Sequence, residues 1–339
     1  MIELKDDALE FSFPEVHPDA RLRVGFQRTL RIPDDEREHA LPPGLGRFPL
    51  RHVDDAGERV PAEWVRRGGV MLPMYQSEAM WLNFTALSDY PFALKVAAGK
   101  VNAATGEEWV DGLHRGPQDY LVVPGQPWLD GYAVEKGVIR QFVAMPLGEG
   151  YSAEEQIFGT AEHGGVQLLA CPMKREAYER KVARRVMALK DHLMSPEMSL
   201  CKAPSARADM SLAPGGRMRQ EIYEDEWEME DWDQRHGSRC FIHLTNSLVW
   251  RAITGEEPPT TPPTSREYTE AGLPWFDYYA ADREALAGSE VLARLRSVLE
   301  EGRRRGRVPL PENAPVDGER VVPIRERPRD RAGVRDGRW

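Results

Sequence analysis

Four short hydrophobic segments in the middle of the chain, separated by turn-forming residues, constrain the fold most. The connections contain Pro124-Gly125, Glu135-Lys136-Gly137, Pro146 to Gly150 and Gly164-Gly165, which supply the positive or preset φ angles that turns need. Connections of this kind favour hairpins over the helical crossovers that join parallel strands. We therefore predict an antiparallel meander with strands at residues 120–123, 132–134, 138–144 and 166–170.

The segments before this block have the same β character. Residues 9–13 and 22–26 alternate apolar with polar or small side chains, as strands that bury one face do. A stretch rich in Pro, Gly and charge at residues 33–69 predicts mostly loop, and strand-like segments resume at Val70. The sequence thus predicts an α+β protein with an antiparallel β-rich body, sandwich-like or barrel-like, over residues 1–175.

The hydrophobic period changes after residue 175. One face of a predicted helix over residues 175–193 is apolar, and its members are Ala177, Val182, Val186, Leu189 and Leu193. We predict this amphipathic helix and a Pro-rich linker over residues 176–200, and a mainly helical part over 201–302. That part includes a helix within residues 239–254, ended by Gly255, since Gly is the commonest residue after a helix.

The last segment, residues 303–339, differs from the rest in charge and composition. It holds 11 Arg and 6 acidic residues, so it carries +5, whereas the rest of the chain carries −15. With little to bury, it is predicted to be a disordered basic tail. A strongly acidic body repels a phosphate backbone, so nucleic acid is an improbable partner. The tail itself suggests self-association or a protein partner.

Cysteine use and hydropathy indicate the compartment. Cys171, Cys201 and Cys240 are odd in number and widely spaced, which disfavours a disulfide framework and favours a reducing environment. No apolar run approaches the 18 residues of a membrane span, and the acidic N-terminus lacks the apolar core of a signal peptide. We expect a cytoplasmic protein, and the excess of 37 Arg over 8 Lys suggests a GC-rich bacterial genome.

The first candidate site is the set His236, Cys240 and His243. On a helix these residues would share one face, where they could bind zinc or activate a thiol. No second ligand pair completes a metal site, so metal binding is the weaker possibility. Cys240 and His243 are the candidate catalytic pair, and a buried structural role is the competing interpretation.

The second candidate is a polar pocket around a turn. His163 and Gln167 flank Gly164-Gly165, and the glycines let a ligand approach closely. A meander would place neighbouring polar side chains across from them, and these are Arg140, Gln141, Tyr151 and Gln156. A tight turn that needs no ligand explains the glycines equally.

The third candidate is a repeated aromatic hexapeptide, at residues 127–132 and 274–279. Trp128, Trp275 and Asp277 would form a ligand-binding or interface surface if they were exposed together. If they are buried, they serve packing.

These observations leave the function open between two classes. No metalloprotease, phosphate-loop, dinucleotide-binding or serine-hydrolase motif occurs, and no pattern indicates a cofactor. We favour a non-catalytic binding or assembly protein. The alternative is an enzyme that uses the Cys240 and His243 centre, or the His163 pocket, on a small polar substrate.

Overall fold

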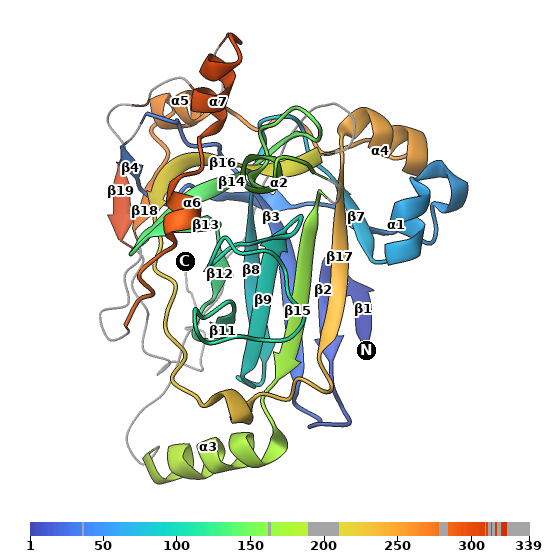
Figure 1. Cartoon of the computed structure of the whole chain (residues 1–339), viewed down its shortest axis with the longest axis vertical. Helices are drawn as coiled ribbons and strands as arrows, with labels where there is room; N and C mark the ends of the chain where they lie inside the picture. The colour runs from blue at the N-terminus through green and yellow to red at the C-terminus, as the bar shows by residue number, and fades with distance from the viewer. Residues whose placement is uncertain are drawn as a thin grey trace, which may run out of the picture.

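The computed structural model describes residues 1–35, 37–161, 164–188, 210–277 and 284–308, together with 310, 313, 316 and 320–323. Most strands belong to one large sheet (Figure 1). The strands are β1 Ile2–Lys5, β2 Ala8–Ser12, β3 Arg21–Thr29, β4 Glu38–His39, β5 Gly44–Arg47, β6 Arg51–His52, β7 Val70–Pro73, β8 Ala79–Leu87, β9 Phe92–Ala98, β10 Val101–Asn102, β11 Leu121–Val123, β12 Trp128–Leu129, β13 Gly131–Glu135, β14 Val138–Pro146, β15 Val166–Pro172, β16 Met210–Arg219, β17 Ser238–Thr245, β18 Trp275–Asp277 and β19 Val321–Pro323.

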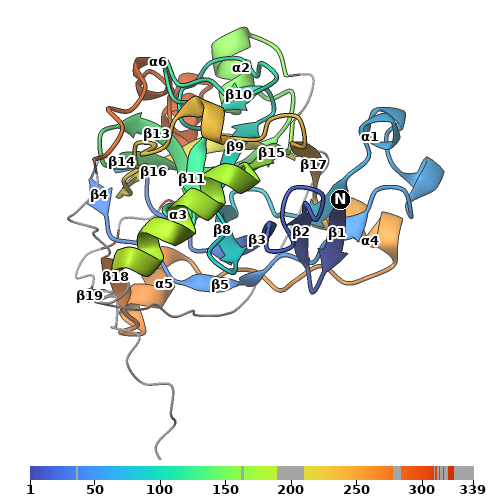
Figure 2. The ribbon, with the colours of Figure 1, turned by 90° about the horizontal axis from the view of Figure 1, so that it is seen from below.

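The helices are short and lie around this sheet. They are α1 Ala62–Arg67, α2 Ala153–Phe158, α3 Arg175–Ala188, α4 Ser247–Thr254, α5 Ser265–Glu270, α6 Glu290–Ala293 and α7 Val298–Arg304, with single 3-10 turns at Gly57–Arg59 and Met229–Asp231. Seen from below, α3 runs across one end of the long strands (Figure 2). The helices α2, α5 and α7 lie at the opposite end (Figure 1). Among the described helices, none has the length and apolarity needed to cross a bilayer.

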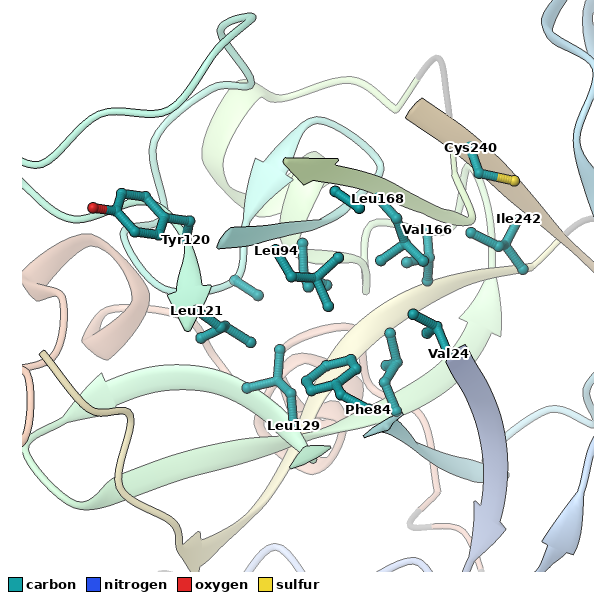
Figure 3. Close-up of a cluster of buried hydrophobic side chains, with 14 of the residues drawn as sticks. Val24, Phe84, Leu94, Tyr120, Leu121, Leu129, Val166, Leu168, Cys240 and Ile242 are labelled. Carbon is teal, nitrogen blue, oxygen red and sulfur yellow. The ribbon is translucent and has the colours of Figure 1, made fainter. Parts of the chain in front are cut away.

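The prediction of a mainly antiparallel, β-rich α+β body is confirmed. Strands β1, β2, β3 and β8 pair in that order, and the β3–β8 register runs from Arg21 opposite Leu87 to Thr29 opposite Ala79. A second series joins β11, β9, β15 and β17. Side chains from both series form one buried core, in which Val24 and Phe84 lie opposite Leu94, Val166 and Ile242 (Figure 3). Closure as a sandwich or a barrel stays a prediction.

The meander is correct only in its central hairpin. β13 and β14 pair across the turn at Gly137, but β14 next pairs with β16 and β8, and β15 pairs with β9 and β17. The connection from β14 to β15 is long enough to hold α2, which begins at Ser152 with a capping box to Glu155. This connection therefore allows β15 to lie away from β14, its predicted neighbour.

The C-terminal part, predicted to be mainly helical, contains helices α4, α5, α6 and α7 as well as strands β16, β17 and β18 among the described residues. β16 and β17 lie after residue 200 and hydrogen-bond to strands that precede it. Within the predicted helix 239–254, β17 occupies the first half and only α4 is helical. Asn246 caps α4 by accepting from two backbone N–H groups, and Gly255 ends it in the left-handed conformation, as predicted. Cross-strand partners on β15 favour an extended conformation for 238–245.

The helix predicted at 175–193 is described as α3 to Ala188. Ala177 is buried there, but Val182 is 39% exposed, so the predicted apolar face is not continuous in the core. Leu189, Leu193 and the predicted linker to residue 200 lie outside the described residues. The described residues of the predicted tail include the end of α7 and β19, which pairs with β18 in parallel. Most of the tail beyond Val308 lies outside the described residues.

One close backbone approach aligns β7 beside β17 in parallel. Gly69 directly precedes β7 with φ +87°, and a Cβ there would lie 2.1 Å from the carbonyl oxygen of Phe241. Gly255 also has a positive φ, but a Cβ there meets nothing within 4 Å.

We predict that Gly69→Ala lowers the free energy of unfolding by about 3 kcal/mol or more, because both backbone strain and a backbone clash must be relieved. Gly255→Ala, the matched control, costs only about 1 kcal/mol of left-handed strain. Urea denaturation of both variants measures the difference. Equal losses would contradict the close approach.

Candidate functional site

The predicted His-Cys-His cluster is not assembled. β17 is a strand, so residues three apart point to opposite faces. Cys240 lies in the main core (Figure 3), whereas His243 lies on the other side, with its ring stacked 4.5 Å from that of Trp64. His236 is exposed and pairs with Asp233 at 2.8 Å. Among the described residues, no three His, Cys, Asp or Glu side chains are grouped to hold a metal.

The environments of Cys240 and His243 suit structural roles. Burial raises the pKa of the Cys240 thiol to about 12, so the thiol is protonated at neutral pH. Burial also lowers the pKa of His243 to about 4, although the hydrogen bond to the Gly68 carbonyl opposes the shift. The neutral imidazole donates from Nε2 to that carbonyl at 3.0 Å and joins β17 to the end of α1.

The described residues predicted for the pocket around the 162–167 turn do not gather at that turn. His163 lies outside the described residues. Gln167 donates to the Gly99 carbonyl and accepts from Arg239, so its amide is occupied on β15. Arg140 and Gln141 are not across from it, because β14 and β15 are not neighbours.

The two aromatic hexapeptides meet in a small core. Trp275 is fully buried there and donates from its indole nitrogen to Thr269 Oγ1 at 3.0 Å. Trp128 packs half-buried against the same cluster, which also contains Ile32 and Met218. Asp277 ends β18 and is half-buried. This arrangement supports the packing interpretation of both motifs.

A cavity of about 70 Å³ lies where the ends of β3 and β14 meet α7. We name it the Arg31 cavity. Its polar lining comes from Arg31, Gln76, Tyr151, Arg307 and Asn313, and its apolar lining from Met145, Val298, Leu299, Val308 and Leu310, with Gly302 between them. Val308 is 86% exposed, so the cavity reaches solvent on that side.

Arg31 carries the strongest chemical signal in this cavity. Its side chain is almost completely buried, and Nη2 donates to Asp34 Oδ2 at 3.2 Å and to Asn313 Oδ1 at 3.5 Å. Nε and Nη1 have no hydrogen-bond partner within the described part of the chain, nor has Asp34 Oδ1. A buried guanidinium with unused N–H groups is costly unless an acceptor reaches it.

Polar side chains hold the Arg31 segment in place. Gln141 donates to the Leu30 carbonyl at 2.8 Å and accepts from the Ile32 N–H at 3.0 Å. Ser265, at the start of α5, donates to the Arg31 carbonyl. Gln141, a predicted ligand-binding residue, therefore positions the backbone on both sides of Arg31.

Two more predicted residues fasten the opposite wall. Gln156 donates to the carbonyls of Tyr151 and Arg296, each at 2.9 Å, and accepts from the Arg296 N–H at 2.8 Å. This links α2 to the segment that starts α7. Nη2 of Arg140 lies 3.7 Å from Oε2 of Glu300 in α7. These side chains support the cavity from behind and do not line it.

A buried ion pair lies beside the cavity. Arg28, fully buried on β3, pairs with Glu78, and its Nη2 also donates to the Thr260 carbonyl at 3.3 Å. Glu78 in turn accepts from the Tyr75 N–H at 3.0 Å. Between these residues, Ser77 is buried with φ +69°, a conformation that non-glycine residues adopt only under constraint. The turn 75–78 thus combines a buried charge with backbone strain. It also contains Gln76, which lines the cavity.

The sequence pattern of β3 contained a signal for this site. Leu22, Val24 and Phe26 alternate inward, and the next inward position is Arg28. A charged residue in an inward register predicts a buried, paired charge. Arg31 had no comparable pattern, because it follows the strand.

The comparisons with known proteins add no relative. No family model, no curated protein and no solved structure matches the chain.

We predict that Glu78→Gln lowers the free energy of unfolding by about 3–5 kcal/mol, because it leaves Arg28 charged and buried without its carboxylate. The double variant Arg28→Met/Glu78→Gln removes both charges and keeps an acceptor for the Tyr75 N–H. It should recover part of the loss in a denaturation experiment. A double variant less stable than Glu78→Gln would contradict the pairing.

We also predict an acid-sensitive contribution from His243. Its folded pKa of about 4 lies below the ordinary 6.5, so the neutral ring stabilises the fold fully above pH 6.5. That contribution falls as the pH drops from 6.5 towards 4, by at most about 3 kcal/mol. His243→Gln keeps a donor for Gly68 without this titration. Stability curves of the two proteins should converge as the pH falls, and parallel curves would refute the assignment.

Proposed function

We propose that this chain is a non-catalytic binding protein of the cytoplasm that holds a small anionic ligand in the Arg31 cavity. One observation carries the proposal: Arg31 lines an open cavity, and two of its guanidinium nitrogens, both buried, have no partner among the described residues. An anion is the acceptor that such a group binds most strongly.

The surroundings of Arg31 favour binding over catalysis. The lining offers donors from Arg31, Arg307 and the amides of Gln76 and Asn313. Among the described lining residues there is no cysteine, histidine or carboxylate to serve as nucleophile or general base. The protonated Cys240 thiol and the hydrogen-bonded His243 ring also favour binding over the enzyme alternative.

The size of the cavity limits the ligand. One water needs roughly 10–15 Å³ of such space, so the cavity takes about five water-sized groups. This size suits an inorganic anion or a very small organic acid.

We predict that millimolar acetate or phosphate binds the wild-type protein and raises its melting temperature, because a ligand that binds only the folded state stabilises it. Arg31→Gln should weaken binding roughly tenfold to hundredfold, the equivalent of one or two hydrogen bonds to a charged group. Isothermal titration calorimetry measures both proteins.

Two variants keep this test decisive. Arg294→Gln removes the same charge from the residue after α6, where the side chain is 79% exposed, and should bind like wild type. If Arg31→Gln does not fold, Arg307→Gln serves instead, because its side chain is 46% exposed and lines the mouth of the cavity. Absence of anion binding to wild type, or an equal loss in Arg294→Gln, would overturn the proposal.

A further inference from the structure

We infer that the ligand of the Arg31 cavity is a monocarboxylate with a short aliphatic chain, an inference that rests on the proposed function. The cavity has two kinds of wall. Arg31 supplies charged donors on one side, and Met145, Val298 and Leu310 supply an apolar surface on another. A ligand that satisfies both walls has a compact anionic head and a hydrocarbon tail.

The apolar wall argues against a purely polar anion. Met145, Val298 and Tyr151 belong to one buried cluster, with Leu310 packed against it. Phosphate or sulfate would leave this surface facing a strongly hydrated ion. An aliphatic tail instead gains affinity from it, at about fourfold per buried methylene.

Nearby carboxylates argue against a second negative charge on the ligand. Asp34 pairs with Arg31, and its Oδ1 has no donor among the described residues. Glu149 pairs with Arg307 at the mouth. Each lining arginine therefore already has an acidic partner, and a dianion bound at Arg31 would lie close to Asp34, where like charges repel. A single negative charge is the best match.

The cavity volume sets the length of the tail. Space for about five water-sized groups accommodates a carboxylate head with two or three carbons beyond it. The same chemistry occurs at the carboxyl end of a polypeptide that finishes in an aliphatic residue. The free acid is the better match to the volume, since a peptide must also pass Arg307 and Val308.

The experiment compares five probes by isothermal titration calorimetry with the full chain. Butyrate should bind roughly tenfold or more tighter than acetate, and butyramide, which has the same shape without the charge, should not bind measurably. Phosphate should bind more weakly than butyrate. The peptide acetyl-Gly-Gly-Val should also bind more weakly than butyrate. Tighter binding of this peptide would overturn the free acid as the ligand and indicate the carboxyl end of a polypeptide instead.

A wall variant separates the tail from the head. Leu310→Asn should reduce the preference for butyrate over acetate to within about threefold, whereas Arg31→Gln should weaken both acids and keep that preference. Leu310 is only half-buried, so this variant tests the wall at small cost to the fold.

The experiment distinguishes failure of the carboxylate inference from failure of the proposed function. Phosphate binding that exceeds butyrate binding and depends on Arg31 would overturn the carboxylate inference and leave the anion-binding function standing. Binding of butyramide equal to that of butyrate would also overturn the inference. If none of the anions binds, the proposed function falls together with the inference.

Discussion

The inward-facing row of β3 ends in an arginine, and the candidate site depends on how the fold accommodates that charge. Arg28 continues the row of Leu22, Val24 and Phe26, so the pairing of β3 with β8 places its guanidinium beside Glu78. A buried charge must be paired or it destabilises the fold. The Thr260 carbonyl adds a second acceptor for Nη2, whereas Nε and Nη1 of Arg28 have no hydrogen-bond partner among the described residues. The cavity lies next to this arrangement.

Arg31, like Arg28, has one acidic partner and two guanidinium nitrogens without a partner among the described residues. Its backbone is fully fastened by Gln141 and Ser265, and α7 is fastened to α2 through Gln156. The guanidinium keeps unused N–H groups. A rigid frame around an unsatisfied donor is a preorganised arrangement, because binding then requires little reordering of side chains. Arg31 differs in this respect from the buried Lys95. The Nζ of Lys95 donates to two backbone carbonyls and to Asp119, so that side chain is fully paired.

Several of the predicted residues proved relevant in a role other than the predicted one. Gln141 and Gln156, predicted as polar groups facing a pocket, support the Arg31 cavity through backbone hydrogen bonds. Trp128 and Trp275, predicted from the repeated hexapeptide, meet in a core cluster. Cys240 and His243 would share a face on a helix, but the strand period places them on opposite faces. In each case the sequence does not show which strand or helix lies beside the residue.

The sequence alone determined the β-rich character, the positions of β2, β3, β13 and β14, the hairpin at Gly137 and the end of α4 at Gly255. These features depend on side-chain alternation and on the φ angles of single residues, which are local properties. The tertiary structure decided which strands became neighbours, that residues 238–245 form a strand, and that Arg31 lies beside α7, about 270 residues further along the chain. Such contacts depend on long-range burial and pairing between distant segments, and no local pattern in this chain records them.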